Sequence, residues 1–278
     1  MIKLANGFEF KYCCASGALG FDGRGYWWER PFVNPANLTI ITKTLTFQPR
    51  KGNYRWWKPW KTFRINSEYT VNAFDLPNPG YEYWINKIYP RIKYPNIIPS
   101  ICPFTTDEAK VMVSALNKLN IRAIEINISC PNTVENFDVI EVITTSLVFA
   151  KHPVIVKIGL NHDFLKLCGT FLNRIVVDAI NTVPWNLLHT AQSPLYPFEG
   201  GVSSAETARL SKLVLGSIKR TYPNIQVISG NGIFSYEEAK SRFELGANAI
   251  SFGTAYILTP WRPAKIIERL ENEFANFR

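Results

Sequence analysis

Short runs of apolar and β-branched residues recur along the chain, and each is followed by a polar or helix-like stretch. Most of these runs are continuously apolar, which is typical of strands buried on both faces of a sheet. We expect strands at eight runs, which span residues 38–44, 69–74, 96–102, 122–129, 153–159, 174–180, 225–230 and 249–253. Strands that alternate with helices indicate βαβ units and a parallel sheet.

Helix signals fall in the intervals between these runs. Ser235 and Glu238 have the spacing of a capping box, and Gly246 is a typical helix stop. The predicted helices span residues 105–119, 204–220, 235–245 and 262–274, with one more inside 131–151.

Roughly eight such units in about 250 residues match the count and size of a closed (β/α)8 barrel. An open, doubly wound sheet is the alternative, but no G-x-G-x-x-G motif follows an early strand. Residues 1–12 are predicted to form a hairpin or lid over the bottom of the barrel. We expect residues 1–278 to form one α/β domain.

Composition narrows the classes of protein. Hydrophobic residues make up 46% of the 278 residues, and no apolar run approaches the roughly 18 residues of a membrane helix. The start of the chain lacks the apolar core of a signal peptide, so we expect a soluble, cytoplasmic protein. The three histidines lack metal-ligand spacing, and no metal site is expected. The net charge of +9 fits a lysine-rich surface, or attraction of an anionic small molecule or nucleic acid.

Polar residues gather where the predicted strands end. In a barrel these carboxyl ends meet at one rim, where chemistry collects. Singly, each residue has a plain explanation, because strand-end lysines are often surface groups and asparagines form turns. Together they predict a polar pocket with two lysines, built from Lys43, Thr44, Asn72, Asn127, Ser129, Cys130, Lys157, Asn181, Thr182 and the glycine turns at 230–232 and 253–254.

Those two glycine turns, "SGNGIFSYEEA" and "SFGTAYI", are candidate phosphate sites. Backbone N–H groups at the start of a helix hold an anion, and glycine allows a close approach. A glycine turn alone is weak evidence for a phosphate site. Here the position of the two turns adds to it, because phosphate sites in barrels are usually formed by the last two loops.

The five cysteines are odd in number and contain no C-x-x-C pair, so reduced thiols are expected. Free cysteines are usually small buried hydrophobic residues, and we expect this of Cys13, Cys14, Cys102 and Cys168. Cys130 differs, because Ser129, Pro131 and Asn132 surround it at the mouth of a strand.

Several motifs together resemble the dihydroorotate dehydrogenases. They are "CASGALGFDG", "TKTLTFQPRKGN", "VNAFDLPNPG", "INISCPN", "VIVKIG" and "INT", in the order of that family. The S-C-P-N sequence is most similar to the soluble, cysteine-type (class 1) catalytic chain. The resemblance extends from about Cys13 to Ile257.

The resemblance implies an FMN-binding barrel that oxidises dihydroorotate to orotate in pyrimidine biosynthesis. Cys130 would remove the C5 proton while C6 gives a hydride to flavin N5. Lys43 and Lys157 would complete the catalytic set, with Lys157 beside the pyrimidine ring of the flavin.

Further site residues are implied by the same resemblance. Those expected to hold the substrate are Lys43, Asn72, Leu76, Asn127, Asn132, Asn181 and Thr182. Those expected beside the flavin ring are Ala15, Ser16, Gly17, Lys43, Thr44, Asn127 and Lys157. Those expected at its phosphate are Gly201, Gly230, Asn231, Gly232, Gly253 and Thr254.

The chain departs from the family pattern at a few positions. Asp75 stands where the family usually has glycine, and its carboxylate would repel an anionic substrate unless it turns away or pairs with a cation. Asn231 also replaces a glycine, a mild change because asparagine tolerates positive φ. Ser251 replaces a glutamine, and the segment after Asn132 is short.

The partner and the exact substrate stay open. A homodimer is a family expectation, and the electron acceptor would be fumarate, quinone, or NAD through an FAD and iron–sulfur subunit. Alternatives are an FMN oxidoreductase acting on another dihydropyrimidine or on tRNA dihydrouridine, or a flavin-binding barrel without turnover. The aromatic and basic stretch at 51–64 is typical of single-strand binders. We interpret it instead as a loop packed on the barrel or on a subunit, with no nucleic acid or membrane partner.

Overall fold

The computed structural model describes residues 1–35, 38–53, 57–129 and 138–276. Its main sheet holds nine short strands, in the order β7-β4-β3-β15-β14-β11-β10-β9-β8, and all neighbours are parallel. The strands are β3 (Tyr12–Cys14), β4 (Thr39–Ile41), β7 (Ile97–Ile98), β8 (Ser100–Ile101), β9 (Ile124–Asn127), β10 (Val154–Ile158), β11 (Val176–Ala179), β14 (Val227–Ser229) and β15 (Ala249–Phe252).

The sheet closes on itself at β7 and β8. Only Pro99 separates these two strands, which together form one strand of the barrel. β7 pairs with β4 on one side, and β8 pairs with β9 on the other. The prediction of a (β/α)8 barrel is confirmed.

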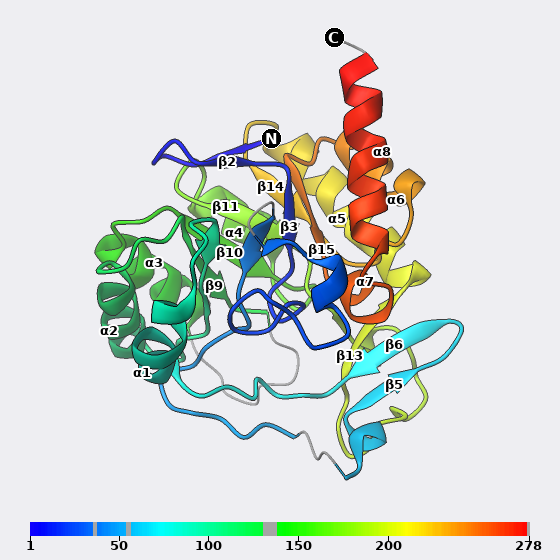
Figure 1. Ribbon diagram of the computed structural model, residues 1–278, viewed down its shortest axis with the longest axis horizontal. Helices are drawn as coiled ribbons and strands as arrows, with labels where there is room; N and C mark the ends of the chain where they lie inside the picture. The colour runs from blue at the N-terminus through cyan, green and yellow to red at the C-terminus, as the bar shows by residue number, and fades with distance from the viewer. Residues whose placement is uncertain (36–37, 54–56, 130–137, 277–278) are drawn as a thin grey trace.

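Helices surround the barrel (Figure 1). They are α2 (Thr106–Leu116), α3 (Val139–Phe149), α4 (Phe164–Thr170), α5 (Ala205–Thr221), α6 (Tyr236–Glu244), α7 (Thr254–Leu258) and α8 (Arg262–Asn276), with short turns at α1 (Tyr81–Tyr83) and η4 (Trp84–Ile88). Side-chain caps explain several starts: the Oγ1 of Thr105 accepts the N–H of Glu108 before α2. At α6 only half of the expected capping box forms, because the carboxylate of Glu238 pairs with Lys212 instead.

The predicted N-terminal hairpin is confirmed, and it plugs the bottom of the barrel. β1 (Ile2–Lys3) pairs antiparallel with β2 (Glu9–Phe10). Its side chains bury against the first inward-facing layer of the barrel, whose members are Cys13, Ile41, Ile98, Ala123, Ile155, Val176, Ile228 and Ala249. Figure 1 shows the hairpin at the end opposite the strands labelled β5, β6 and β13.

One predicted barrel strand is wrong. The run at 69–74 gives β6 (Tyr69–Asn72), which belongs to a separate antiparallel sheet in the order β12-β13-β6-β5. The other members are β12 (Val183–Pro184), β13 (Gly201–Ser204) and β5 (Phe63–Ile65). Its place in the barrel is taken by β3, which has three residues and is too short to stand out as an apolar run.

This second sheet grows from two loops at the carboxyl ends of barrel strands. β5 and β6 lie in the long connection after β4, and β12 and β13 lie between β11 and α5. The sheet therefore adds to the rim where the polar residues gather. Among the described residues, no helix is long and apolar enough to cross a membrane.

Candidate functional site at the carboxyl rim of the barrel

The centre of the rim is a chain of hydrogen bonds around Asn127, the last residue of β9. Its Nδ2 donates to the Oγ1 of Thr44 at 2.9 Å, and its Oδ1 accepts from the Oγ of Ser129 at 3.0 Å. Thr44 is also 2.9 Å from the hydroxyl of Ser100 at the start of β8. The loops after β4 and β9 are thereby fixed to each other, with both predicted residues, Thr44 and Asn127, buried.

Lys43 lies beside this chain, two residues beyond β4. Its backbone N–H donates to the carbonyl of Gly20, and its ammonium is 5.5 Å from the centre of the Phe21 ring. Burial lowers the pKa of Lys43 from its ordinary value to about 8. A buried cation is stabilised when an anion binds next to it, so Lys43 is suited to binding a carboxylate.

The loop after β3, which contains Ala15, Ser16 and Gly17, runs alongside Lys43 and Thr44. The hydroxyl of Thr44 lies 3.5 Å from that of Ser16, at the limit of a hydrogen bond. Gly17 has a φ of +90°, and a Cβ built there would lie 3.8 Å from the side chain of Lys43. The first loop and Lys43 are therefore neighbours at the rim.

Lys157 faces the barrel interior from β10 and is almost fully buried. It stands between Asn127 on β9 and Asp178 on β11 in the strand register. Its ammonium is 3.2 Å from the carboxylate of Asp178. Burial alone would lower the pKa of Lys157, but Asp178 and Glu125 raise it above the ordinary value. Lys157 is thus a charged group inside the barrel, directly opposite Asn127 in the register of β9 and β10.

The loop after β11 joins the same network. Asn181 donates from Nδ2 to the carbonyl of Ser129 at 3.3 Å and accepts the N–H of Thr182 at 2.9 Å. Asn231, after β14, donates to the carbonyl of Asn181 at 3.0 Å. The predicted residues of three different strand ends are therefore linked through amide groups.

Asn72 reaches this rim by a route that the sequence did not predict. It ends β6 in the second sheet, where it faces Gly201 of β13 in the register. Its Nδ2 donates to the carbonyl of Gly201 at 3.4 Å. Because β13 leads directly into α5, Asn72 and Gly201 lie at the carboxyl end of the barrel.

The late glycine turns supply backbone donors. Gly232, Gly253 and Thr254 use none of their N–H groups in hydrogen bonds to other described residues. Gly232 has a φ of +75°, and a Cβ there would lie 2.4 Å from that of Ala208. A free set of N–H groups at the last two strand ends fits a phosphate.

A buried arginine supports these turns from behind. The guanidinium of Arg242 donates to the hydroxyl of Ser211 at 2.7 Å and to the carbonyls of Ala208 and Asn231 at 3.1 and 2.9 Å. Ser211 in turn donates to the carbonyl of Gly230 at 2.7 Å. Arg242 is completely buried and fixes the loop that contains residues 230–232.

Asp75 is paired with a cation. This is one of the two arrangements in which its carboxylate would not repel an anionic substrate. One nitrogen of Arg50 contacts both carboxylate oxygens of Asp75. Asp75 and the predicted substrate residue Leu76 have φ values of +54° and +48°. This left-handed backbone explains why glycine suits the position.

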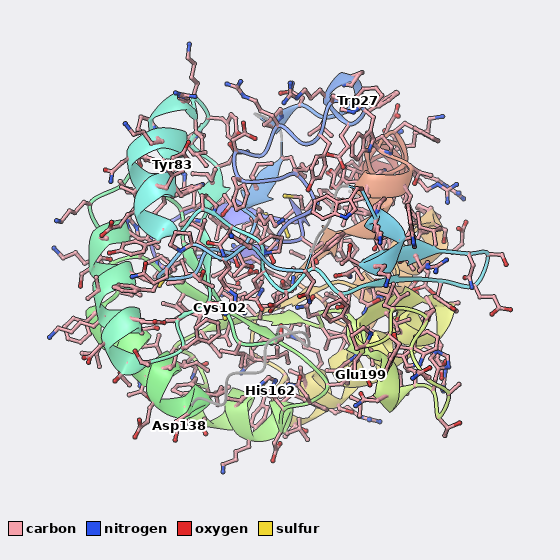
Figure 2. The ribbon with its side chains drawn as sticks, turned by 90° about the horizontal axis from the view of Figure 1, so that it is seen from below. Trp27, Tyr83, Cys102, Asp138, His162 and Glu199 are labelled. Carbon is pink, nitrogen blue, oxygen red and sulfur yellow. The ribbon has the colours of Figure 1, made fainter. Side chains whose placement is uncertain are left out.

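The predicted base Cys130 and the predicted substrate residue Asn132 lie outside the described residues. The other four cysteines are buried, as expected. Figure 2 looks onto the carboxyl end and labels Cys102, which follows β8, and Glu199 in the insertion after β11.

Sequence reasoning missed Glu125, Asp178 and Arg242. Glu125 and Asp178 each come two residues after an inward-facing apolar residue, Ala123 and Val176. The two-residue period of a strand was therefore a signal for the first two. Arg242 had no such signal, because an arginine on an amphipathic helix usually faces solvent.

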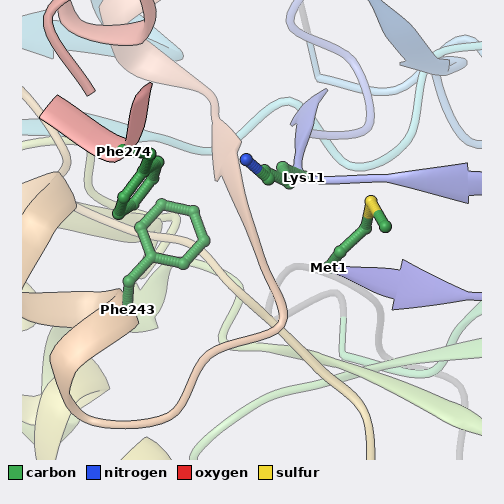
Figure 3. Close-up of a pocket in the computed structure, with 4 residues that line it drawn as sticks. All are labelled: Met1, Lys11, Phe243 and Phe274. Atoms are coloured by element: carbon green, nitrogen blue, oxygen red, sulfur yellow. The ribbon is translucent and has the colours of Figure 1, made fainter. Parts of the chain in front are cut away.

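A separate pocket of about 380 Å³ lies away from this rim. It is lined by Met1, Lys11, Phe243 and Phe274 (Figure 3). Lys11 directly precedes β3, so the pocket is at the amino end of the barrel. Lys11 is already paired with Glu271 at 3.0 Å. This pocket contributes nothing to the rim network.

These features define a (β/α)8-barrel protein with a polar, lysine-containing site at its carboxyl rim. The chain belongs to the dihydroorotate dehydrogenase family, whose model matches residues 7–274. This membership makes it an oxidoreductase and confirms the resemblance seen in its motifs.

Named relatives agree on the family and differ in electron acceptor. The chain is 29% identical to "Dihydroorotate dehydrogenase B (NAD(+)), catalytic subunit" of Bacteroides fragilis, over 93% of this chain and 88% of that protein. A protein of the same name in Petrotoga mobilis is 28% identical, over 95% and 91%. A protein of Aquifex aeolicus, provisionally assigned as dihydroorotate dehydrogenase A (fumarate), is 28% identical over 84% and 80%.

Proposed function

We propose that this chain forms a single FMN-binding domain that oxidises dihydroorotate to orotate in pyrimidine biosynthesis. The observation that carries the proposal is the meeting of Lys43, Thr44, Asn127, Lys157 and Asn181 at one rim, from four separate strands. Family membership supplies the reaction class, and the relatives' names supply the substrate.

The residues present fit FMN. The unused N–H groups of Gly232, Gly253 and Thr254 would hold the phosphate, with Gly201, Gly230 and Asn231 beside them. Ala15, Ser16 and Gly17 would lie against the ring, and Thr44, Asn127 and Lys157 would bind its polar edge. When bound, FMN would accept the hydride from C6 of the substrate.

The proton at C5 of the substrate is assigned to Cys130. A thiol has an ordinary pKa of about 8.5, so a nearby cation would help to form the thiolate that acts as base. General bases of this kind typically contribute about 10²–10⁴-fold to a rate.

The substrate is held by amides and by Lys43. Asn72, Asn127, Asn132 and Asn181 offer both donors and acceptors, which suits the alternating groups on the edges of a pyrimidine. Thr182 and Leu76 would complete the pocket. Lys43 binds the substrate carboxylate, because its burial makes an anionic neighbour favourable. Since Arg50 compensates the charge of Asp75, that residue does not argue for a barrel without turnover.

Electrons would leave the flavin through another protein or a small acceptor. Most of the relatives named above are catalytic subunits of the NAD type, and we extend this to the chain: a partner subunit with FAD and an iron–sulfur cluster would carry electrons to NAD. Fumarate remains the competing acceptor, as for the Aquifex relative. A homodimer and a cytoplasmic location complete the proposal.

The test begins with the purified protein. It should be yellow and release FMN on denaturation at about one equivalent per chain, and dihydroorotate should bleach it without oxygen. Reoxidation with fumarate, with NAD and with NAD plus the partner subunit then identifies the acceptor. A well-folded protein that binds no FMN, or bound FMN that dihydroorotate leaves oxidised, would contradict the proposal.

A further inference from the structure

Three charged side chains meet inside the barrel, just below the rim. Glu125, Lys157 and Asp178 are each two residues beyond an inward-facing apolar residue on β9, β10 and β11, so they point to the barrel axis. All three are at least 95% buried. The ammonium of Lys157 lies 3.2 Å from Asp178, and Glu125 is close enough to both to affect their charge.

The charges in this group do not balance. Two carboxylates and one ammonium leave one excess negative charge if all three are ionised. On β3, Cys13 and Cys14 offer no compensation, since they are buried thiols whose pKa is raised by burial. Ser100 on β8 and Ser251 on β15 are uncharged. An uncompensated buried charge is costly, so one carboxyl group is expected to keep its proton.

Glu125 is the group that keeps it. Neither carboxylate accepts a hydrogen bond with good geometry from a described residue, but Asp178 is 3.2 Å from the ammonium of Lys157, whereas Glu125 has no ion pair among the described residues. Burial, and then the neighbouring Asp178, raise the pKa of Glu125 to about 7, although Lys157 opposes the shift. Its charge therefore changes within the working range of pH.

We propose that Glu125 is a positioning residue that, through the Lys157–Asp178 ion pair, couples flavin reduction to proton uptake inside the barrel. The inference rests on the proposed function, because Lys157 is assigned to the polar edge of the flavin. Nothing in the reaction at the substrate needs this proton, so it is a separate property of the barrel interior.

The coupling follows from charge. In the proposed reaction dihydroorotate would be oxidised by loss of a hydride from C6 to FMN and of the C5 proton to Cys130. The hydride would bring one negative charge to the bound FMN, whose polar edge is assigned to Lys157. A proton from solvent then binds the Glu125 carboxylate and restores the charge of the group. When Glu125 already carries its proton, below about pH 7, no uptake occurs.

The reduction potential of bound FMN tests the coupling. We expect the wild-type potential to fall with pH more steeply than that of Glu125→Gln above pH 7, by up to about 30 mV per pH unit for one extra proton per two electrons. Glu271→Gln is the control, because Glu271 pairs with Lys11 at the amino end of the barrel and should leave the slope unchanged. Equal slopes in wild type and Glu125→Gln, with FMN bound to both, would overturn the inference.

A second measurement, by infrared difference spectroscopy, does not need bound flavin and leaves Glu125 itself unchanged. Glu29 is also buried and its pKa is also raised to about 7 by burial, so the spectra are taken on the Glu29→Gln apoprotein with isotope-labelled glutamate. They should show a protonated carboxyl group at pH 6 that ionises near pH 7. Exposed glutamates are ionised at pH 6, so the absence of this signal would overturn the assignment to Glu125. Failure of the wild type to bind FMN would instead overturn the proposed function, and the infrared signal would still decide the protonation of Glu125.

Discussion

One guanidinium nitrogen of Arg50 lies 3.0 Å from Oδ1 and 3.1 Å from Oδ2 of Asp75. Both side chains are about four-fifths buried, and Asp75 has a φ of +54°. The ion pair thus holds a residue with a Cβ in backbone geometry that favours glycine.

This geometry predicts an order of stabilities. Asp75→Ala and Asp75→Gly both lose the ion pair, but only the glycine variant loses the left-handed strain, which is about 1 kcal/mol or more. Asp75→Gly should therefore be the more stable of the two by about 1 kcal/mol in urea unfolding. Equal free energies of unfolding would show that the backbone at this position carries no such strain.

Cys130→Ala should bind FMN as the wild type does and reduce it far more slowly. Loss of a positioned base lowers the rate of flavin reduction by dihydroorotate by about 10²–10⁴-fold. Anaerobic stopped-flow absorbance measures this rate. Cys168→Ala is the matched control, since Cys168 is buried on α4 and should leave reduction kinetics unchanged. A Cys130→Ala variant with wild-type kinetics would remove Cys130 from its role.

Lys43 should make orotate binding dependent on pH. Its pKa of about 8 means that the free protein carries the cation below pH 8 and loses it above. Orotate affinity should therefore be constant below pH 8 and fall about tenfold per pH unit above it. Titrations of bound-flavin absorbance with orotate from pH 6.5 to 9.5 measure this fall. Lys43→Met should bind weakly at every pH, and a wild-type affinity independent of pH would be inconsistent with the assignment.

Arg242→Met should weaken both the fold and FMN binding. The substitution leaves the carbonyls of Ala208 and Asn231 without their buried donor, which should lower the free energy of unfolding by about 3 kcal/mol. The turn at 230–232 would loosen, so the dissociation constant of FMN should rise. Arg269→Met is the control, because Arg269 is largely exposed and loses only a surface ion pair and a contact with the Tyr236 ring, which should change stability by about 1 kcal/mol or less. Unchanged FMN affinity in Arg242→Met would show that Arg242 does not support the phosphate site.

The barrel could be predicted because its strands are apolar on both faces and are separated by capped helices. The run at 69–74 was misassigned since β6 shares this composition, and only its antiparallel pairing with β13 distinguishes it. The strand β3 was not predicted, because three residues carry too little periodicity to indicate a strand.

The place of several residues at the rim could be predicted from the sequence, whereas their interactions could not. Strand ends placed Lys43, Asn127, Lys157 and Asn181 correctly, because the carboxyl ends of parallel strands share one edge. The partners of these residues depend on register, which a single sequence does not fix. The pairing of Lys157 with Asp178, for example, follows from the register of β10 and β11 in the structure.

A crystal structure of the protein with FMN and orotate is the most direct test of the central claim. The account predicts the polar edge of the flavin at Asn127 and Lys157, its phosphate on the N–H groups of Gly232, Gly253 and Thr254, and the orotate carboxylate at Lys43. A flavin bound elsewhere, or a phosphate held away from these two turns, would contradict it.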